Sequence, residues 1–222
     1  MSENQKGTTV VKCPEPFVPL FSAAEKIMES FFADLKRDPA KGDIEISGVR
    51  YLLVRTDSLA IELHEELRKT FGEAGARQIR YKLAKACGMR DARMFHERLK
   101  VTDPTMKLAL GPVHFAHVGW ASVDIFPESA PQTNEDYFLA YCHPFSFESD
   151  SYLENGLKAD QPVCHMNAGY SAGWCQVSYG IELKAEELTC RAKGDEKCIF
   201  AMAHPRNFDR LVRQYKEKTG LA

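Results

Sequence analysis

The feature that most constrains this chain is a concentration of cysteines near its C-terminal end. Four of its seven cysteines lie between positions 164 and 198, and two of them, Cys190 and Cys198, flank a Lys-Gly-Asp turn in EELTCRAKGDEKCIF. Two strands joined across this turn would bring both thiols together, as a metal site requires. The odd cysteine count and the polar start MSENQKGTTVVK, which lacks the apolar region of a signal peptide, argue against a disulfide framework.

Two further residues can complete a four-coordinate site. Cys164 begins a segment of small residues that we expect to be helical, and Glu187 lies three residues before Cys190. Thiolates and a carboxylate are both zinc ligands, so the hypothesis is a closed site of three cysteines and one glutamate. Cysteines that simply pack in the core are the competing interpretation, because CxxC pairs are absent. The other possible fourth ligands are Glu182, Glu186, His165 and Cys175.

The pattern of apolar residues predicts a single α+β domain in which antiparallel strands pack against helices. We interpret residues 1–16 as a loose lead. Helices are expected over about 18–36, 58–71, 73–99, 164–180 and 205–218. Strands are expected over 44–47, 49–54, 107–118, 120–126 and 137–149, with a late hairpin of 182–192 and 198–203. Functionally, the chain divides into 1–43, a possible dimerisation element; 44–205, the main domain with a metal lobe at 160–203; and 206–222, a possible signalling linker.

Charge and hydropathy limit the partners. The chain has 29 basic and 31 acidic residues, a net charge of -2, and no run of 18 apolar residues. We therefore expect a cytoplasmic protein that contacts neither nucleic acid nor membrane directly.

The segment from Cys164 to Cys198, with GYSAGWCQVSYG, an E-x-x-C step and a Cys-Arg-Ala-Lys-Gly-Asp turn, resembles the 4-vinyl-reductase domain. More specifically, the chain is similar to the N-terminal sensor domain of XylR/DmpR-type activators of aromatic catabolism. Upstream, the resemblance is carried by GVRYLLVRTDSLAIELHEELRKTFG, GARQIRYKLAKACGMRDA, GPVHFAHVGW and HPFSFES, so that it covers about residues 44–205.

The resemblance implies a dimeric sensor that binds a small aromatic effector in a buried pocket and holds zinc. The implied zinc ligands are Cys164, Glu187, Cys190 and Cys198, the same four that the spacing favours. A closed shell leaves no position for water, so the zinc is expected to be structural. The activators carry an ATPase and a DNA-binding domain after the sensor, and neither follows here before Ala222. We expect the output to pass through a regulatory partner or an effector domain outside this sequence.

The pocket departs from the phenol-type pattern. Those sensors orient the effector hydroxyl with a histidine and a tryptophan at positions occupied here by Phe115 and His143. If 107–118 is a strand, alternation places Phe115 and His117 on one face and His114 on the other. The polar group that orients the ligand is then His117 or His143, and phenol itself becomes doubtful as the ligand. The other expected pocket residues are Trp120, Tyr141, Tyr170 and Trp174.

Two other classes of function compete with sensing. A reductase or accessory of tetrapyrrole metabolism would need a cofactor, and the sequence has no nucleotide-binding motif. A structural adaptor would have a filled core without a cavity. A nucleophilic-cysteine enzyme is disfavoured, because Cys175 and His165 would lie about 15 Å apart along one helix. The expected function is therefore sensing by a protein that is not an enzyme.

Overall fold

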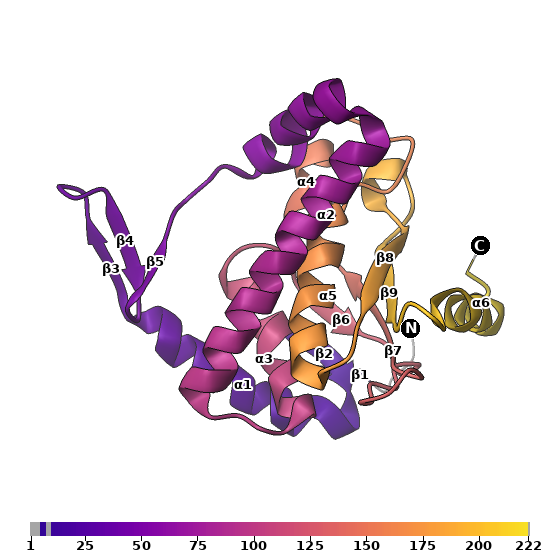
Figure 1. Ribbon diagram of the computed structural model, residues 1–222, viewed down its shortest axis with the longest axis horizontal. Helices are drawn as coiled ribbons and strands as arrows, with labels where there is room; N and C mark the ends of the chain where they lie inside the picture. Colours follow the sequence, from indigo (N-terminus) through magenta and orange to yellow (C-terminus); the bar gives the residue numbers. More distant parts are fainter. Residues whose placement is uncertain (1–4, 8–9, 222) are drawn as a thin grey trace.

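The computed structural model describes residues 5–7 and 10–221 as a six-stranded sheet covered by helices, with a separate three-stranded arm (Figure 1). The sheet has the order β1-β2-β6-β7-β9-β8. Its described strand pairs are antiparallel except for β2 with β6, so the predicted α+β fold is confirmed with one parallel pair. The strands are β1 (Gln5–Gly7), β2 (Val11–Pro14), β6 (Val123–Ile125), β7 (Phe138–His143), β8 (Lys184–Thr189) and β9 (Cys198–Ala203).

Strand β7 shows that both faces of this sheet are covered. All six of its residues are buried. Leu139 and Tyr141 belong to the main core with α3 and α5, whereas Phe138 and Ala140 pack with Phe208 of α6. Because alternate residues of a strand point to opposite faces, α6 closes the face opposite α3 and α5. These helices are α3 (Pro104–His117), α5 (His165–Tyr179) and α6 (Phe208–Thr219); the predicted C-terminal helix thus begins after Pro205.

The long helix α2 (Leu63–Leu99) packs closely along α5. A Cβ atom added at Gly88 would lie 2.2 Å from the carbonyl oxygen of Tyr170, and one at Gly169 would lie 2.2 Å from that of Tyr81. Such distances exclude any side chain, so the glycines allow the two backbones to touch. The predicted small-residue helix is confirmed, and Gly180 ends it in a left-handed conformation (φ 69°). At Gly72 (φ 70°) the helix α2 is interrupted, as the two predicted helices 58–71 and 73–99 require.

The prediction of a loose N-terminal lead is wrong for residues 11–16. Val11 and Cys13 are buried, and β2 enters the sheet beside β6. The short segment VKCP alternates buried and more exposed residues, a two-residue period that is typical of a strand but brief enough to be overlooked in the sequence. After β2 come η1 (Glu15–Phe17) and α1 (Val18–Ala33), which confirms the first predicted helix. Residues 1–4 of the predicted lead lie outside the described residues.

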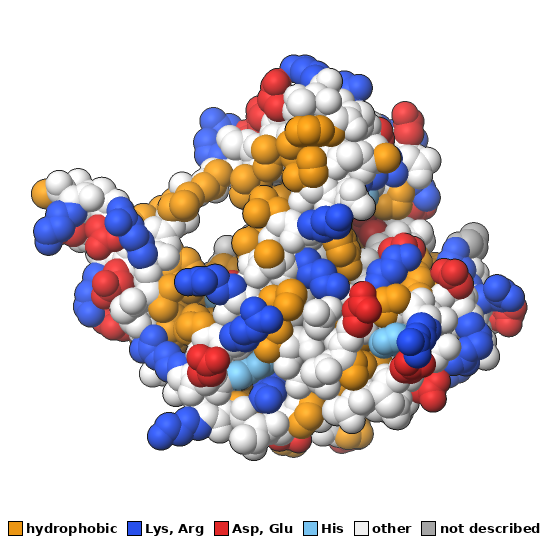
Figure 2. Space-filling model, in the orientation of Figure 1, with side chains coloured by type: hydrophobic (Ala, Val, Ile, Leu, Met, Phe, Trp, Pro, Cys, Tyr) orange, Lys and Arg blue, Asp and Glu red, His pale blue; other side chains and the backbone are white. Residues whose placement is uncertain are grey.

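The predicted hairpin is confirmed and gains a third strand. Together the strands β3 (Leu35–Asp38), β4 (Asp43–Ile46) and β5 (Val49–Tyr51) form an arm that projects from the body (Figure 1). Residues 52–55 were expected to extend the last strand, but they form a strap that leads from the arm to the turn η2 (Ser58–Glu62) and α2. Leu52 and Leu53 in this strap are each 73% exposed. Figure 2 shows hydrophobic side chains along the strap and an open passage between it and the body.

The prediction of a strand over 107–118 is wrong, because this segment is the helix α3. Asp103 accepts a hydrogen bond from the Met106 N–H at 2.7 Å, and Pro104 follows as the first helical residue, which is a strong helix start. In a helix, His114 and His117 share a face, since they are three residues apart. The predicted strand 137–149 also ends early, at His143, and is followed by the helix α4 (Phe147–Glu154).

Candidate metal centre and effector cavity

The four predicted metal ligands meet in one place. Cys164, Glu187, Cys190 and Cys198 each offer a donor atom, and these atoms all lie within 4.8 Å of one another. The sulfurs of Cys164 and Cys198 are 3.9 Å apart, about twice the length of a disulfide bond. The three thiols are fully buried, and the Oε1 atom of Glu187 is buried without a hydrogen-bond partner. A buried carboxylate oxygen without a partner is costly, so this group is suited to hold a metal ion.

Three elements carry these donors. Cys164 directly precedes α5, Glu187 lies in β8, and Cys198 is the first residue of β9. Cys190 follows β8 and begins the turn η3 (Arg191–Lys193), so the predicted late hairpin is confirmed. The backbone N–H of Cys164 donates to Oε2 of Glu187 at 2.8 Å. This bond joins the start of α5 to the hairpin.

The surroundings of the sulfurs favour charge in the cluster. The backbone N–H of Arg191 donates to Sγ of Cys198 at 3.3 Å. Hydrogen bonds from the thiols of Cys164 and Cys198 lower the pKa of Cys190, whereas burial raises the pKa of Cys164 and of Glu187. A bound cation would offset this burial cost, because metal binding displaces the protons of its ligands.

The rival ligands are placed elsewhere. Among the described residues, the cluster contains none of Glu182, Glu186, His165 and Cys175. Glu186 forms an ion pair with Lys184 at the surface, and Cys175 lines a cavity farther along α5. As strand alternation required, only one of the two adjacent glutamates of β8 faces the cluster.

A small cavity of about 30 Å³ lies between α3, α5 and the sheet. Four of the seven expected pocket residues line it: Phe115, Tyr141, Tyr170 and Trp174, each at most 3% exposed. The remaining lining is mainly apolar and comes from Leu108, Gly111, Pro112, Val123, Ile125, Leu139, Ser171, Cys175 and Met202. Many of these residues were missed, because a strand over 107–118 could not have presented Leu108, Gly111 and Phe115 to one cavity.

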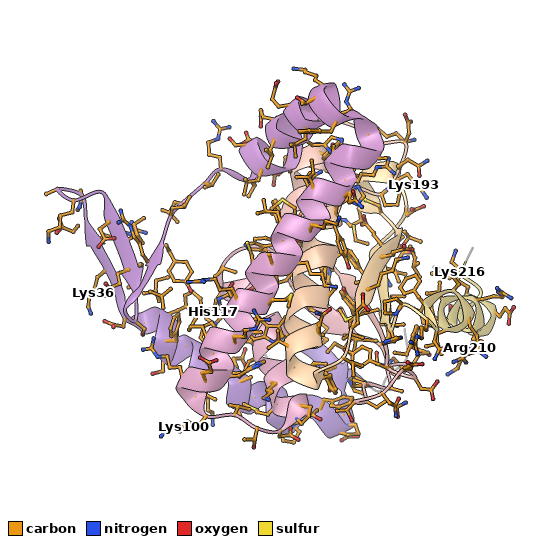
Figure 3. The ribbon with its side chains drawn as sticks, viewed as in Figure 1. Lys36, Lys100, His117, Lys193, Arg210 and Lys216 are labelled. Atoms are coloured by element: carbon orange, nitrogen blue, oxygen red, sulfur yellow. The ribbon has the colours of Figure 1, made fainter. Side chains whose placement is uncertain are left out.

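The three other expected pocket residues do not line this cavity. His117, labelled in Figure 3, stacks on Phe32 of α1 with ring centroids 4.8 Å apart. Trp120 lines surface hollows instead. The ring of His143 is centred 5.6 Å from Phe115 and 5.3 Å from Tyr141, just behind the lining.

His143 is nevertheless unusual. It is fully buried, and neither ring nitrogen has a hydrogen-bond partner. Burial lowers the pKa of His143 to about 3, so the ring is neutral at pH 7. The hydroxyl of Tyr141, on the same strand, also lacks a hydrogen-bond partner. Two polar groups therefore stand unused beside an otherwise apolar cavity.

Tyr170 connects the cavity to the outer part of the molecule. Its hydroxyl donates to Oδ2 of Asp91 in α2 at 2.7 Å and lies 3.0 Å from Nδ1 of His114. Burial lowers the pKa of His114 to about 3. The neutral ring can then donate its Nδ1–H to the tyrosine oxygen while that hydroxyl donates to Asp91.

A buried ion pair near the metal cluster was not anticipated from the sequence. Arg80 and Glu148 have fully buried side chains, with Nη2 2.7 Å from Oε1. Glu148 also accepts the backbone N–H groups of Met166 and Asn167, in the first turn of α5. The pair thus joins α2, α4 and the start of α5, immediately after Cys164.

Comparisons with known proteins divide the chain into two matched parts. Residues 31–127 match the model of a family described as activator of aromatic catabolism, and residues 145–203 match the model of the 4-vinyl-reductase domain. The phenol regulator MopR of Acinetobacter guillouiae is 25% identical over 179 residues, covering 79% of this chain and 32% of that protein. The transcriptional regulatory protein XylR of Pseudomonas putida is 24% identical over 174 residues, covering 78% of this chain and 30% of that protein. The chain thus spans about a third of the length of these relatives.

The fold is also similar to a solved structure. The phenol-responsive sensory domain of the transcription activator PoxR, determined with phenol, superposes with a TM-score of 0.73 at 22% sequence identity. The match covers 88% of this chain and 95% of that domain. The resemblance inferred from the sequence is therefore confirmed by both kinds of comparison. In the described residues, no helix is both long and apolar enough to span a membrane.

Proposed function

Taking the match to the family of activators of aromatic catabolism as the premise, we propose that this chain is a zinc-containing sensor domain. It binds a small aromatic effector in the cavity between α3, α5 and the sheet, and passes the signal to a regulatory partner or effector domain. The observation that carries the proposal is the buried, aromatic-lined cavity in a fold that matches this family. The role is regulatory, in signal transduction and transcription, rather than enzymatic.

Zinc suits the metal cluster better than other common ions. A tetrahedral zinc with Zn–S bonds of about 2.3 Å separates its sulfurs by about 3.8 Å, close to the 3.9 Å between Cys164 and Cys198. Three thiolates favour zinc over magnesium or calcium, which prefer oxygen ligands. Glu187 supplies the fourth donor, so the site is closed and its zinc is structural.

The effector is an aromatic molecule with at most a small polar substituent. The cavity is lined by rings and aliphatic side chains, which favours burial of apolar surface. Two polar groups, His143 and the hydroxyl of Tyr141, lie at its sheet side without partners. We propose that one of them accepts or donates the hydrogen bond that orients the effector. PoxR was solved with phenol, but the phenol-type histidine position is Phe115 here, so the preferred effector can differ.

Output requires elements outside the cavity. We propose that the chain works as a cytoplasmic homodimer, with residues 1–43 contributing to the dimer and residues 206–222 forming the signalling linker. The exposed apolar strap at Leu52 and Leu53 is consistent with a protein surface that is covered in the assembly. The basic face of α6, which includes Arg210, points outward (Figure 3).

The test combines metal analysis with ligand-dependent melting. Purified protein is expected to contain one zinc per chain, and Cys190→Ser is expected to lose the zinc and much of the stability, because structural zinc sites contribute about 10–16 kcal/mol of apparent binding free energy. The exposed cysteine gives the control, since Cys87→Ser should keep both.

Phenol, toluene and benzoate are then titrated while the melting temperature is followed. A ligand present at 100 times its Kd should stabilise the protein by about 2.7 kcal/mol. Zinc-free protein of full stability would refute the metal centre. If no member of an aromatic panel raises the melting temperature, the effector proposal is wrong.

A further inference from the structure

Tyr170 is a wall shared by two spaces. It lines the buried cavity and also a surface groove between the arm and α2, which we call the arm groove. The arm groove has a volume of about 1530 Å³ and is bordered by Tyr51, Leu52, Asp91 and Trp120 among others. Figure 2 shows the opening between the strap and the body on this side. Among the residues that line the cavity, Tyr170 alone also lines the arm groove.

The cavity cannot accept an aromatic molecule without a change in its lining. Its volume is about 30 Å³, enough for one or two water molecules. An apolar cavity of about 150 Å³ is known to accommodate benzene in another protein. At least one lining side chain must therefore move by several ångströms when an aromatic ligand enters.

The helix backbone is not free to supply this movement. A Cβ at Gly88 would lie 2.2 Å from the Tyr170 carbonyl oxygen, and one at Gly173 would lie 2.1 Å from the Lys85 carbonyl oxygen. The helix α5 therefore cannot approach α2, and moving it away would break a close-packed contact along several turns. The extra room must come from side-chain rotation.

The other lining aromatic residues are held from behind. The indole N–H of Trp174 donates to the Lys107 carbonyl oxygen at 2.8 Å, and its ring lies against Gly111. The ring of Tyr141 stacks on the fully buried Phe200, with centroids 5.2 Å apart and an interplanar angle of 7°. Both rings have core atoms behind them, whereas Tyr170 has the open groove.

What holds Tyr170 in place is a specific hydrogen bond at its outer end. Its hydroxyl donates to the carboxylate of Asp91 at 2.7 Å, and Asp91 itself lines the arm groove. The ring is flanked by Phe115 on the cavity side and Trp120 on the groove side, with centroids 5.0 and 4.9 Å away. When the hydrogen bond breaks, the ring can rotate toward the groove while keeping aromatic contact with Trp120.

We propose that Tyr170 is the movable wall that determines access to the cavity and the size of ligand it accepts. The hydrogen bond to Asp91 keeps the wall closed, and rotation of the ring into the arm groove both admits the ligand and provides the room it occupies. The identity of the ligand as an aromatic effector rests on the proposed function; the movable wall rests on the cavity, the groove and the hydrogen bond.

The first experiment needs no ligand. Hydrogen exchange of the Trp174 indole N–H is followed by NMR in wild-type protein and in Tyr170→Phe, which keeps the ring but removes the hydroxyl. Loss of a hydrogen bond to a charged group should raise the open population, and hence the exchange rate, by about 10-fold or more. Tyr179→Phe is the matched control: it makes the same change in the same helix at a residue that lines neither space. Equal exchange in wild type and Tyr170→Phe, or an equal increase in the control, overturns the proposal.

The second experiment uses phenol and stopped-flow tryptophan fluorescence. Tyr170→Phe is expected to raise both the association and the dissociation rate constants by a similar factor, about 10-fold, since a weaker closed state affects entry and exit alike. Asp91→Asn should move both rates in the same direction through the other partner of the bond, and a melting scan establishes that each variant is folded. If the variants change only the dissociation rate, Tyr170 is an ordinary contact and the movable wall is refuted. If the exchange result holds but phenol and its analogues do not bind, the wall stands and the aromatic-effector function fails.

Discussion

The buried ion pair between Arg80 and Glu148 allows a quantitative test of what holds the helical layer to the metal lobe. Both side chains are fully buried, and the shortest N–O distance is 2.7 Å. One turn earlier on the same helix, Arg77 pairs with Glu73 at 2.6 Å, with side chains 32% and 44% exposed. The two pairs have nearly the same length, so burial is the main variable between them.

Arg80→Met should be far more damaging than Arg77→Met. Removing one partner of a buried ion pair leaves an uncompensated charge and costs about 3–5 kcal/mol. Glu148 would keep its two backbone donors at the start of α5 but lose its only countercharge among the described residues. An exposed i,i+4 pair contributes about 0.3–0.5 kcal/mol. For a domain of this size, the Arg80 substitution should lower the melting temperature by about 6–20 °C.

Urea unfolding of zinc-loaded protein, followed by circular dichroism, measures both changes. The double variant Arg80→Met/Glu148→Gln removes both charges, so its loss should be smaller than the sum of the single losses by at least about 1 kcal/mol. A loss below about 1 kcal/mol for Arg80→Met, or equal losses for Arg80→Met and Arg77→Met, would contradict the reasoning from burial.

Two further predictions concern acid and close packing. His143 has a folded-state pKa of about 3 and an ordinary value of 6.5, so the unfolded chain takes up the proton first; stability should fall as the pH is lowered below about 6.5, by about 2 kcal/mol at pH 5 from this group, and urea unfolding of His143→Phe at pH 7 and pH 5 should lack that part of the loss. Gly88→Ala places a Cβ 2.2 Å from the carbonyl oxygen of Tyr170, a backbone atom that cannot rotate away, and should cost at least about 1–3 kcal/mol in thermal unfolding, whereas Cys87→Ala beside it should stay within about 0.5 kcal/mol.

The metal cluster could be predicted from the sequence because its geometry is mostly local. Glu187, Cys190 and Cys198 lie on one hairpin, whose Lys-Gly-Asp turn and two-residue alternation are visible in the letters. Only Cys164 comes from farther away, and it directly precedes a helix that the small residues predicted correctly. Local periodicity and turn chemistry were therefore sufficient to place four side chains together.

The helix α3 could not be assigned from periodicity, because its residues serve two partners. KLALGPVHFAHV contains a Gly-Pro pair that usually ends a helix, and its apolar residues are too dense to show a period of 3.6. In the structure, Gly111 is needed because the Trp174 ring lies where its Cβ would be. Tertiary packing overrides the local signal there, and the only clear sign in the sequence was the Asp103-Pro104 helix start.

Long-range pairs left no local sign at all. Arg80 and Glu148 are 68 positions apart, and each reads as an ordinary surface charge in its own segment. Similarly, the bond from Tyr170 to Asp91 spans 79 positions. Such pairs depend on the packing of α2 along α5, which the glycines permitted but did not specify.

The helix α5 links the metal centre to the cavity wall, and its packing determines how a signal can leave the cavity. Its first turn is tied to the hairpin by Cys164 and to α2 by Glu148, and its middle is locked to α2 at Gly169. A zinc ion would strengthen the first of these ties, so ligand binding cannot readily slide the helix. The part of this wall that has open space behind it is the ring of Tyr170, which faces the arm groove. We therefore expect an effector to act outward through Tyr170 and Asp91 on the arm and the strap, rather than along the helix toward α6.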